Sequence, residues 1–231
     1  MTTRTTRIVL LTVFALATSL AGFAQLPCGV PNQIACLAWD GGSNLTASQN
    51  DTTIGGFGNF ATTYQQFTFT QTWNVQSYHW VGGYFNPATQ GPIGAWTLAF
   101  YDDNAGAPGN TIFSLVAGGN ALETFVSNVN GFPIYVYEQD ILGGFNMAPG
   151  TYWASVVPDL AFPPQWGWAT ATGGTGTGGF QCFFGSCAAT GTDLNFAIDG
   201  TSVNSTPEPG TLIMLGTGVL GLAGTLRRKL L

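Results

Sequence analysis

The sequence predicts an all-β protein: an antiparallel β-sandwich or jelly-roll-like domain, flanked by an N-terminal signal peptide and a C-terminal transmembrane helix. Three observations predict this class. Charged residues make up only 7% of the 231 residues, whereas aromatic residues make up 13%. Glycine, proline and asparagine recur between short runs rich in Val, Thr, Phe, Tyr and Trp, which is typical of strands joined by turns. Helical periodicity is confined to the two chain ends.

Alternating side chains mark the strands, because successive residues of a strand point to opposite faces. Trp96, Leu98 and Phe100 share one face of a predicted strand. Near the end of the domain, the apolar residues 194, 196 and 198 are expected to point inward, and Asp193, Asn195 and Asp199 outward. Further strands are expected at 66–70, 74–85, 111–116, 122–127, 133–138, 151–157 and 166–170. About nine short strands separated by turns favour a sandwich over a βαβ fold.

Two stretches break this rhythm. Residues 38–61 are polar and Gly-rich, and we expect a long loop or an irregular sheet edge there. Residues 173–179 read Gly-Gly-Thr-Gly-Thr-Gly-Gly and are expected to form a flexible surface connection. Neither stretch resembles a phosphate-binding loop, which needs a following helix and, in the P-loop, a lysine.

The N-terminus has the layout of a secretory signal peptide. Arg4 and Arg7 precede the apolar residues 8–17, and small residues at Gly22 and Ala24 flank a candidate cleavage site. The predicted organisation is therefore a signal peptide at 1–24, one β-sandwich domain at 25–200 and a linker at 201–206. A permanent N-terminal membrane helix is the alternative.

The last residues, 207–231, combine three features in order. Pro207, Glu208 and Pro209 come first, an apolar run follows at 211–226, and the basic residues Arg227, Arg228 and Lys229 end it. As a helix the run spans roughly 24 Å, which is short for a hydrocarbon core of about 30 Å. Basic side chains that reach to the membrane surface can close this gap. They also hold the C-terminal end in the cytoplasm, so the preceding domain is expected on the opposite side of the membrane.

This tail resembles the PEP-CTERM sorting signal of Gram-negative bacteria. The resemblance implies an exosortase-type membrane protease as partner. It also implies a membrane-anchored precursor that is cut near Pro207–Pro209 and passed to the cell envelope or the extracellular space. A plain C-terminal membrane anchor is the alternative. Within the domain, five motifs resemble a β-sandwich found in exported bacterial proteins with such tails, at 80–85, 102–109, 150–153, 166–168 and 193–200. This resemblance implies no activity.

The distribution of charge excludes several partners. No lysine or arginine occurs between Arg7 and Arg227, whereas ten acidic residues lie between the signal peptide and Pro207. Binding of nucleic acid or anionic lipid depends on cationic side chains, so neither is expected as a partner of the domain. Membrane contact is expected only through the C-terminal helix before processing.

One acidic cluster has oxygen ligands that suit Ca²⁺. Asp102, Asp103 and Asn104 end a predicted strand, and Gly106 and Gly109 allow a tight bend after them. A hairpin turn in which these side chains cap backbone amides explains the same residues and is favoured. No cofactor is therefore expected, with Ca²⁺ as the candidate to test.

The four cysteines, Cys28, Cys36, Cys182 and Cys187, all lie in the exported part. An even number outside the cytoplasm favours disulfides, with three connectivities open. The local pairs Cys28–Cys36 and Cys182–Cys187 are preferred. A zinc site is the alternative, although the close Cys-x-x-Cys pairs of structural zinc sites are missing.

Catalytic groups are scarce in this sequence. His79 is the only histidine and lies between Tyr78 and Trp80, where a structural imidazole is expected rather than a general base. No nucleophile elbow or zinc-protease motif occurs. Glu123 and Glu138 could contribute to a glycosidase pair, but no context selects them. The protein is therefore expected not to be an enzyme.

Trp166 and Trp168 are two residues apart in a predicted strand, so they share a face, as sugar-stacking platforms do. Packing in the core explains the same spacing and is favoured. The function expected from the sequence is a non-enzymatic exported envelope or extracellular-matrix protein. A carbohydrate-binding module that takes exopolysaccharide is the alternative, and an uncharacterised hydrolase is a distant third.

Overall fold

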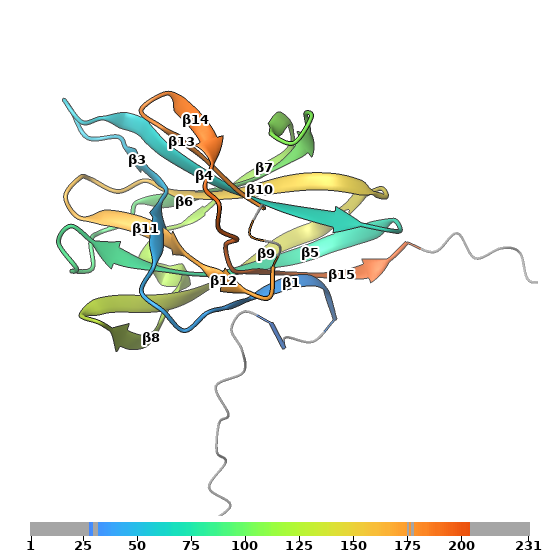
Figure 1. The fold of residues 1–231 in the computed structure, drawn as a ribbon, viewed down its shortest axis with the longest axis horizontal. Coiled ribbons are helices and arrows are strands. Elements are labelled where there is room, and N and C mark those ends of the chain that lie inside the picture. Colours follow the sequence, from blue (N-terminus) through green and yellow to red (C-terminus); the bar gives the residue numbers. More distant parts are fainter. Residues whose placement is uncertain (1–27, 30–31, 175, 177, 204–231) are drawn as a thin grey trace, which may run out of the picture.

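Two antiparallel sheets pack face to face as a sandwich (Figure 1). The structure is a computed structural model that describes residues 28–29, 32–174, 176 and 178–203. The predicted signal peptide and the PEP-CTERM-like tail, including its apolar run, lie outside these residues. Within the described part, no helix has the length and apolarity needed to cross a membrane.

The first sheet has the order β12-β1-β15-β5-β11-β2, and β9 and β8 extend it beyond β5. Its strands are β1 (Gln33–Trp39), β2 (Leu45–Ala47), β5 (Trp73–Phe85), β8 (Glu123–Val129), β9 (Phe132–Met147), β11 (Gln165–Ala169), β12 (Ala171–Thr172) and β15 (Phe196–Ser202). The second sheet has the order β14-β13-β4-β10-β6-β7, with β3 beside β4. Its strands are β3 (Gln49–Asp51), β4 (Gly58–Phe69), β6 (Ala95–Asp103), β7 (Pro108–Gly118), β10 (Gly150–Pro158), β13 (Gly179–Phe183) and β14 (Ser186–Ala189). A short 3₁₀ turn, η1 (Asn120–Leu122), precedes β8.

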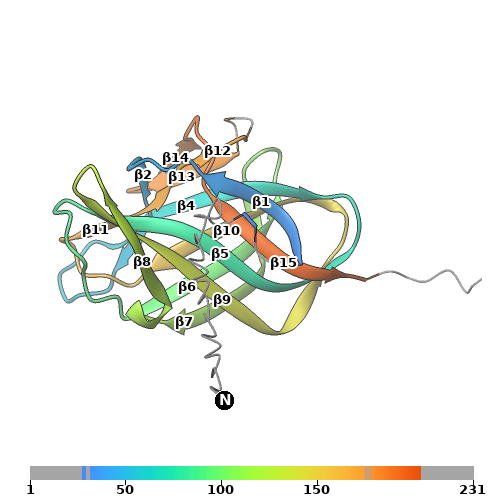
Figure 2. The same ribbon diagram turned by 90° about the horizontal axis from the view of Figure 1, so that it is seen from below.

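Strand β5 runs the length of the sandwich and defines its two ends. At one end Trp73 pairs with Ser202, the last residue of β15. At the other end Phe85 pairs with Gln165, the first residue of β11. Figures 1 and 2 both show β11 and the end of β15 on opposite sides of the molecule. The described chain therefore ends, at Val203, on the side of the sandwich opposite to Gln165.

The core between the sheets is built mainly from aromatic side chains. Trp80 stacks on Tyr137, with ring centroids 5.3 Å apart, and Trp96 meets Trp166 edge to face at 4.9 Å. Such offset and edge-to-face contacts add to the free energy gained by burying the rings. Gly82 is needed here, because a Cβ at that position would lie 2.1 Å from the ring of Trp166.

The predicted all-β sandwich is confirmed, and so are the predicted strands at the centre of each sheet. Residues 74–85 lie in β5, 96–101 in β6, 151–157 in β10 and 133–138 in β9. The prediction for residues 38–61 was partly wrong, because this stretch contains β2, β3 and the start of β4. The sequence also did not predict β1, β12, β13 and β14. Most of the missed strands are short, and their sequences show no apolar alternation.

Two residues predicted to point outward are buried instead. Asn195 is 0% exposed, and its amide accepts a hydrogen bond from the Val81 N–H and donates to the carbonyls of Val81 and Ala169. Asp193 accepts hydrogen bonds from the N–H groups of Gly176 and Gly178 at 2.6 and 2.7 Å. Both side chains take the place of backbone partners, which the alternation of polarity cannot reveal.

Both predicted local disulfides are confirmed. Cys28 bonds to Cys36 of β1, and Cys182 bonds to Cys187 across the β13–β14 hairpin. The zinc alternative is wrong, because all four sulfur atoms are used in these bonds. The second disulfide lies directly beside the candidate site.

Candidate ligand-binding pocket

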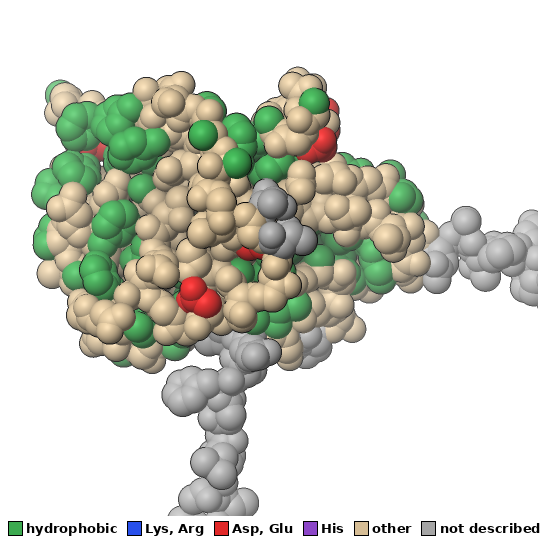
Figure 3. Space-filling view, in the orientation of Figure 1, with side chains coloured by type: hydrophobic (Ala, Val, Ile, Leu, Met, Phe, Trp, Pro, Cys, Tyr) green, Lys and Arg blue, Asp and Glu red, His purple; other side chains and the backbone are tan. Residues whose placement is uncertain are grey.

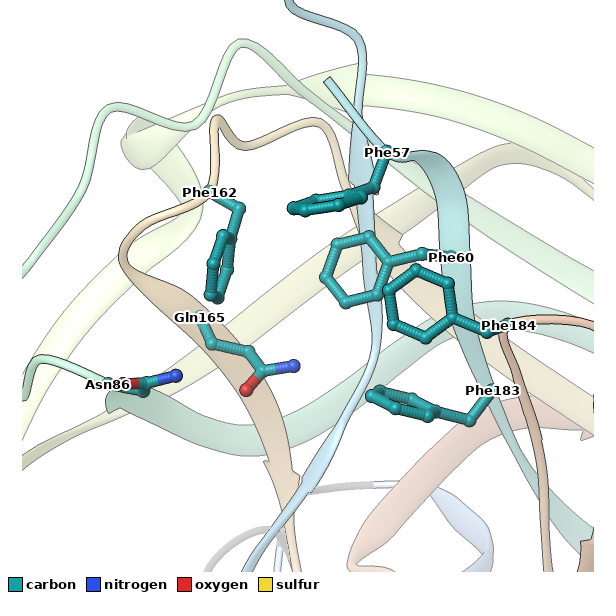
Figure 4. Close-up of a pocket in the computed structure, with 7 residues that line it drawn as sticks. All are labelled: Phe57, Phe60, Asn86, Phe162, Gln165, Phe183 and Phe184. Atoms are coloured by element: carbon teal, nitrogen blue, oxygen red, sulfur yellow. The ribbon is translucent and has the colours of Figure 1, made fainter. Parts of the chain in front are cut away.

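Five phenylalanine rings meet at the end of the sandwich where β11 begins (Figure 4). They come from three separate segments of the chain. The rings belong to Phe57 and Phe60 around the start of β4, Phe162 before β11, and Phe183 and Phe184 at the β13–β14 hairpin. They enclose a pocket of about 230 Å³, to which Asn86 and Gln165 contribute the polar side chains. We call this site the phenylalanine pocket.

The rings of the phenylalanine pocket are open to solvent to different degrees. Phe60 is 4% exposed and forms the floor, whereas Phe57 is 58%, Phe184 59% and Phe183 40% exposed. At about 200 Å² per aromatic side chain, the three exposed rings present roughly 300 Å² of apolar surface. A contiguous apolar patch of this size often serves as an interaction site. In Figure 3, hydrophobic side chains gather at this end of the molecule, near β3 and β14.

The rings hold one another at fixed angles. Phe184 stacks on Phe60 with centroids 5.3 Å apart and an interplanar angle of 28°. Phe57 stands nearly perpendicular to Phe184 at 5.6 Å and meets Phe162 edge to face at 5.7 Å. The π faces of the ring set are therefore turned in several directions around one cavity.

Asp51 positions two of these segments from below. The side chain is 3% exposed, and its carboxylate accepts hydrogen bonds from the Thr53 hydroxyl at 2.5 Å and the Phe57 N–H at 3.2 Å. Burial alone raises the pKa of the Asp51 carboxyl. The hydrogen bonds from Thr53, Phe57 and the backbone of Phe162 outweigh it, so the pKa lies below its ordinary value. One ionised carboxylate thus ties the loops of Phe57 and Phe162 together.

The hairpin that carries the other two rings has an unfavourable backbone at its tip. Phe184 has φ +46° and Gly185 has φ +81°, so both lie in the left-handed region that two-residue hairpin turns require. A bulky residue there costs about 1–2 kcal/mol. The Cys182–Cys187 disulfide closes this hairpin, and the Phe184 N–H donates to the Phe60 carbonyl at 2.7 Å. The fold therefore maintains a strained phenylalanine at the rim of a pocket, a pattern that occurs at functional sites.

Two side-chain amides in the pocket have no partner within the described residues. Gln165 is 8% exposed, and Figure 4 shows its amide directed toward the rings. Asn86 lies at the end of β5 and faces the same cavity. A buried amide such as that of Gln165 is normally hydrogen-bonded, so it can receive a polar atom of a ligand, and the exposed Asn86 amide beside it can do the same.

Trp166 and Trp168 do not form a surface platform. Both are 0% exposed. The Trp166 indole N–H donates to the Tyr137 hydroxyl at 2.9 Å, and that of Trp168 donates to the Asn195 carbonyl at 2.7 Å. The alternative of a sugar-binding platform at these two residues does not fit their burial, and the favoured core packing accounts for their spacing.

Asp102 and Asp103 end β6, and Asn104 begins the turn to β7. Asp102 accepts a hydrogen bond from the Asn110 N–H at 2.5 Å, and Asp103 accepts one from the Gly106 N–H at 3.1 Å. Both carboxylates cap backbone groups, as the turn alternative expects. Across the described ranges, no cluster of three or more His, Cys, Asp or Glu side chains is placed to hold a metal ion.

His79 lies on β5 beside Ser77 and Asp199. Its Nε2 atom is 2.9 Å from the Asp199 carboxylate and 3.1 Å from the Ser77 hydroxyl. In a catalytic triad, the acid and the nucleophile contact different ring nitrogens. The second ring nitrogen, Nδ1, is 3.9 Å from the Glu138 carboxylate, which is too far for a hydrogen bond. Because no acid is hydrogen-bonded to Nδ1, this group does not have the geometry of a triad.

Glu123 is the centre of a hydrogen-bond network at the edge of the core. Its carboxylate accepts hydrogen bonds from the hydroxyls of Tyr84 and Tyr137 and from the amides of Gln90 and Asn120. Burial, together with the Glu123 charge, raises the pKa of both tyrosines. Glu138 follows Tyr137 on β9 and points to the opposite face of the sheet. The two glutamates therefore do not face each other as a glycosidase pair would.

The sequence reasoning missed the phenylalanine pocket, although two local signals mark it. One is the Phe-Phe pair enclosed by Cys182 and Cys187, and the other is Phe57 between two glycines. No local pattern links these segments with Phe162, which is distant in sequence from both.

No curated protein and no solved structure matches the chain. A family match is found for the C-terminal segment, at residues 205–229, and it is to the PEP-CTERM protein-sorting motif. This match includes Pro207, Glu208 and Pro209 and the basic residues that follow the apolar run. The chain therefore carries the sorting motif of an exported protein that an exosortase-type protease processes from a membrane-anchored precursor.

Proposed function

We propose that the protein is a non-enzymatic component of the cell envelope or the extracellular matrix. The observation that carries the proposal is the PEP-CTERM motif at the end of a chain whose described part is a β-sandwich. Such a motif directs a protein to the cell surface, and a disulfide-bonded sandwich suits that oxidising location.

The polar groups of the sandwich support a structural rather than a catalytic role. The carboxylates of Asp51, Asp193 and Glu123 accept hydrogen bonds from the chain itself. General acid–base catalysis needs a group that can exchange a proton with a substrate. These three carboxylates are instead used to position loops and strands.

The test is expression of the full chain in its native host, followed by separation of inner membrane, outer envelope and extracellular matrix. The wild-type protein is expected in the envelope or matrix fraction. Glu208→Ala should leave the sandwich folded, but unprocessed precursor should accumulate in the inner membrane. Asn204→Ala, just before the matched motif, is the control and should be sorted like the wild type. Wild-type protein that stays in the inner membrane would contradict the proposal.

A second candidate function is a carbohydrate-binding module. The observation that favours it is no longer the pair Trp166 and Trp168 but the phenylalanine pocket, with its exposed rings and its unpartnered amides. An envelope or matrix role and carbohydrate binding are compatible, because a matrix protein needs a surface that holds matrix polymers.

A further inference from the structure

We propose that the phenylalanine pocket binds a sugar ring of a neutral polysaccharide. This inference rests on the carbohydrate-binding candidate above and specifies its site and its ligand class.

The pocket offers the two kinds of contact that a pyranose ring needs. The C–H groups of a sugar ring form an apolar face, which packs on the π face of an aromatic ring. Phe57, Phe162 and Phe184 supply such faces around one cavity. The hydroxyl groups of the sugar can then bond to the amides of Gln165 and Asn86, each of which both donates and accepts hydrogen bonds.

The unpartnered amides argue against a purely apolar occupant. Gln165 is more than nine-tenths buried, and no hydrogen bond of its amide occurs within the described residues. An acyl chain over the pocket would shield this group from water without giving it a partner, which is unfavourable. A ligand with hydroxyl groups satisfies it.

Charge selects neutral over acidic sugars. The chain has no lysine or arginine between Arg7 and Arg227, so no such side chain of the sandwich can pair with a uronate, sulfate or phosphate group. The Asp51 carboxylate lies beneath the pocket and adds a repulsive contribution. The surrounding field of acidic residues acts in the same direction.

The size of the surface argues against a second copy of the chain. A stable protein interface buries about 800 Å² on each partner. The exposed rings of the pocket present roughly 300 Å², estimated from about 200 Å² per aromatic side chain. A pocket of about 230 Å³ instead fits a small group inserted from a longer polymer.

The position of the pocket fits a ligand outside the membrane. Asn86 follows the last residue of β5, whereas the described chain leaves the sandwich beside Trp73, the first residue of β5. A strand of 13 residues at about 3.3 Å per residue spans roughly 40 Å. The pocket therefore lies at the end of the sandwich opposite to Val203, the last described residue before the sorting motif.

The pocket is preorganised, which lowers the entropy lost on binding. Asp51 fixes the loops of Phe57 and Phe162, and the Cys182–Cys187 disulfide closes the hairpin of Phe183 and Phe184. Reduction of this disulfide should therefore weaken binding even though neither sulfur contacts the sugar.

The experiment is a calorimetric titration of the exported protein, purified from the native host, with neutral hexasaccharides of glucose, mannose and N-acetylglucosamine. Oligogalacturonate and a C12 fatty acid serve as acidic and apolar probes. At least one neutral oligosaccharide is expected to bind, and Phe184→Ala and Gln165→Leu should each weaken it tenfold or more. Phe125→Ala is the matched control, because Phe125 is 53% exposed but lies outside the pocket. It should bind like the wild type.

Three results would overturn the proposal. They are no binding of any neutral oligosaccharide, unchanged binding by Phe184→Ala with an unchanged unfolding curve, or tighter binding of the acidic or the fatty-acid probe. Each of these leaves the envelope or matrix role standing if the protein still fractionates there. Absence of the wild-type protein from those fractions would instead refute the proposed function itself.

Discussion

Two aromatic clusters of this protein differ in whether the second sheet of the sandwich covers them. Trp166 and Trp168 on β11 point into the space between the sheets and are completely buried, whereas Phe57 and Phe184 are on loops and more than half exposed. Spacing along a strand says that two rings share a face, but not whether a second sheet covers that face. Rings at turns have no layer above them, so an aromatic turn is the better indicator of a binding surface in a sandwich.

The largest expected effect separates the two clusters by stability. Trp166→Ala removes a fully buried ring that contacts Trp96 and Tyr137, and should lower the free energy of unfolding by about 3–5 kcal/mol. Phe184→Ala should cost less than about 1 kcal/mol, because more than half of that ring is already exposed. Urea unfolding of both variants measures this. Equal losses in the free energy of unfolding for the two variants would contradict the distinction between a buried and an exposed cluster.

A smaller effect tests the hydrogen bonds of the buried cluster. The Tyr137 hydroxyl receives a hydrogen bond from Trp166 and donates one to Glu123, so Tyr137→Phe should destabilise the fold by about 1–3 kcal/mol. The matched control is Tyr78→Phe, since the buried Tyr78 hydroxyl has no partner within the described residues. That change should be neutral or slightly stabilising in the same urea experiment. A loss for Tyr78→Phe as large as for Tyr137→Phe would contradict the assignment.

Asp51→Asn tests the anchor of the exposed cluster. The variant should lower the free energy of unfolding at pH 7 by about 1–2 kcal/mol. The neutral amide oxygen of asparagine accepts hydrogen bonds from Thr53 and Phe57 more weakly than the ionised carboxylate does. Since the folded pKa of Asp51 is below that of the unfolded chain, its contribution is present above about pH 4 and is lost as the pH falls through the folded pKa. The difference between wild type and variant should therefore shrink on acidification. A difference that is the same at pH 7 and pH 2 would argue against this role.

The smallest effect has the opposite sign. Phe184→Asn places a residue that tolerates positive φ before Gly185, and relief of strain is offset by the lost contact with Phe60. The net change should be a gain of up to about 0.5 kcal/mol in stability, together with loss of the pocket rim. Phe183→Asn is the control and should give no gain, because Phe183 is not among the residues with positive φ. Thermal unfolding of both variants tests whether the fold retains Phe184 at the expense of stability.

How much the sequence could predict depends on whether a signal was local. Alternation of residues 96–101 predicted β6, and cysteine spacing indicated both disulfides correctly, because each signal is contained in one segment. The burial of Asn195 was not predictable, since its amide replaces backbone partners on β5 and at the end of β11. The phenylalanine pocket joins residues near positions 57, 162 and 184, which only the folded sheets bring together. The tail is the clearest local signal, and its match at 205–229 agrees with the prediction.

The most direct test of the account is the share of the protein retained in the extracellular matrix of the native host. Full-length wild type and the double variant Phe57→Ala/Phe184→Ala should be exported and processed alike, because neither residue lies near the sorting motif. The account predicts that the wild type stays in the matrix fraction and that the double variant is released into the medium. Equal retention of the two proteins, with equal unfolding curves, would contradict the claim that the exposed aromatic cluster is the functional surface.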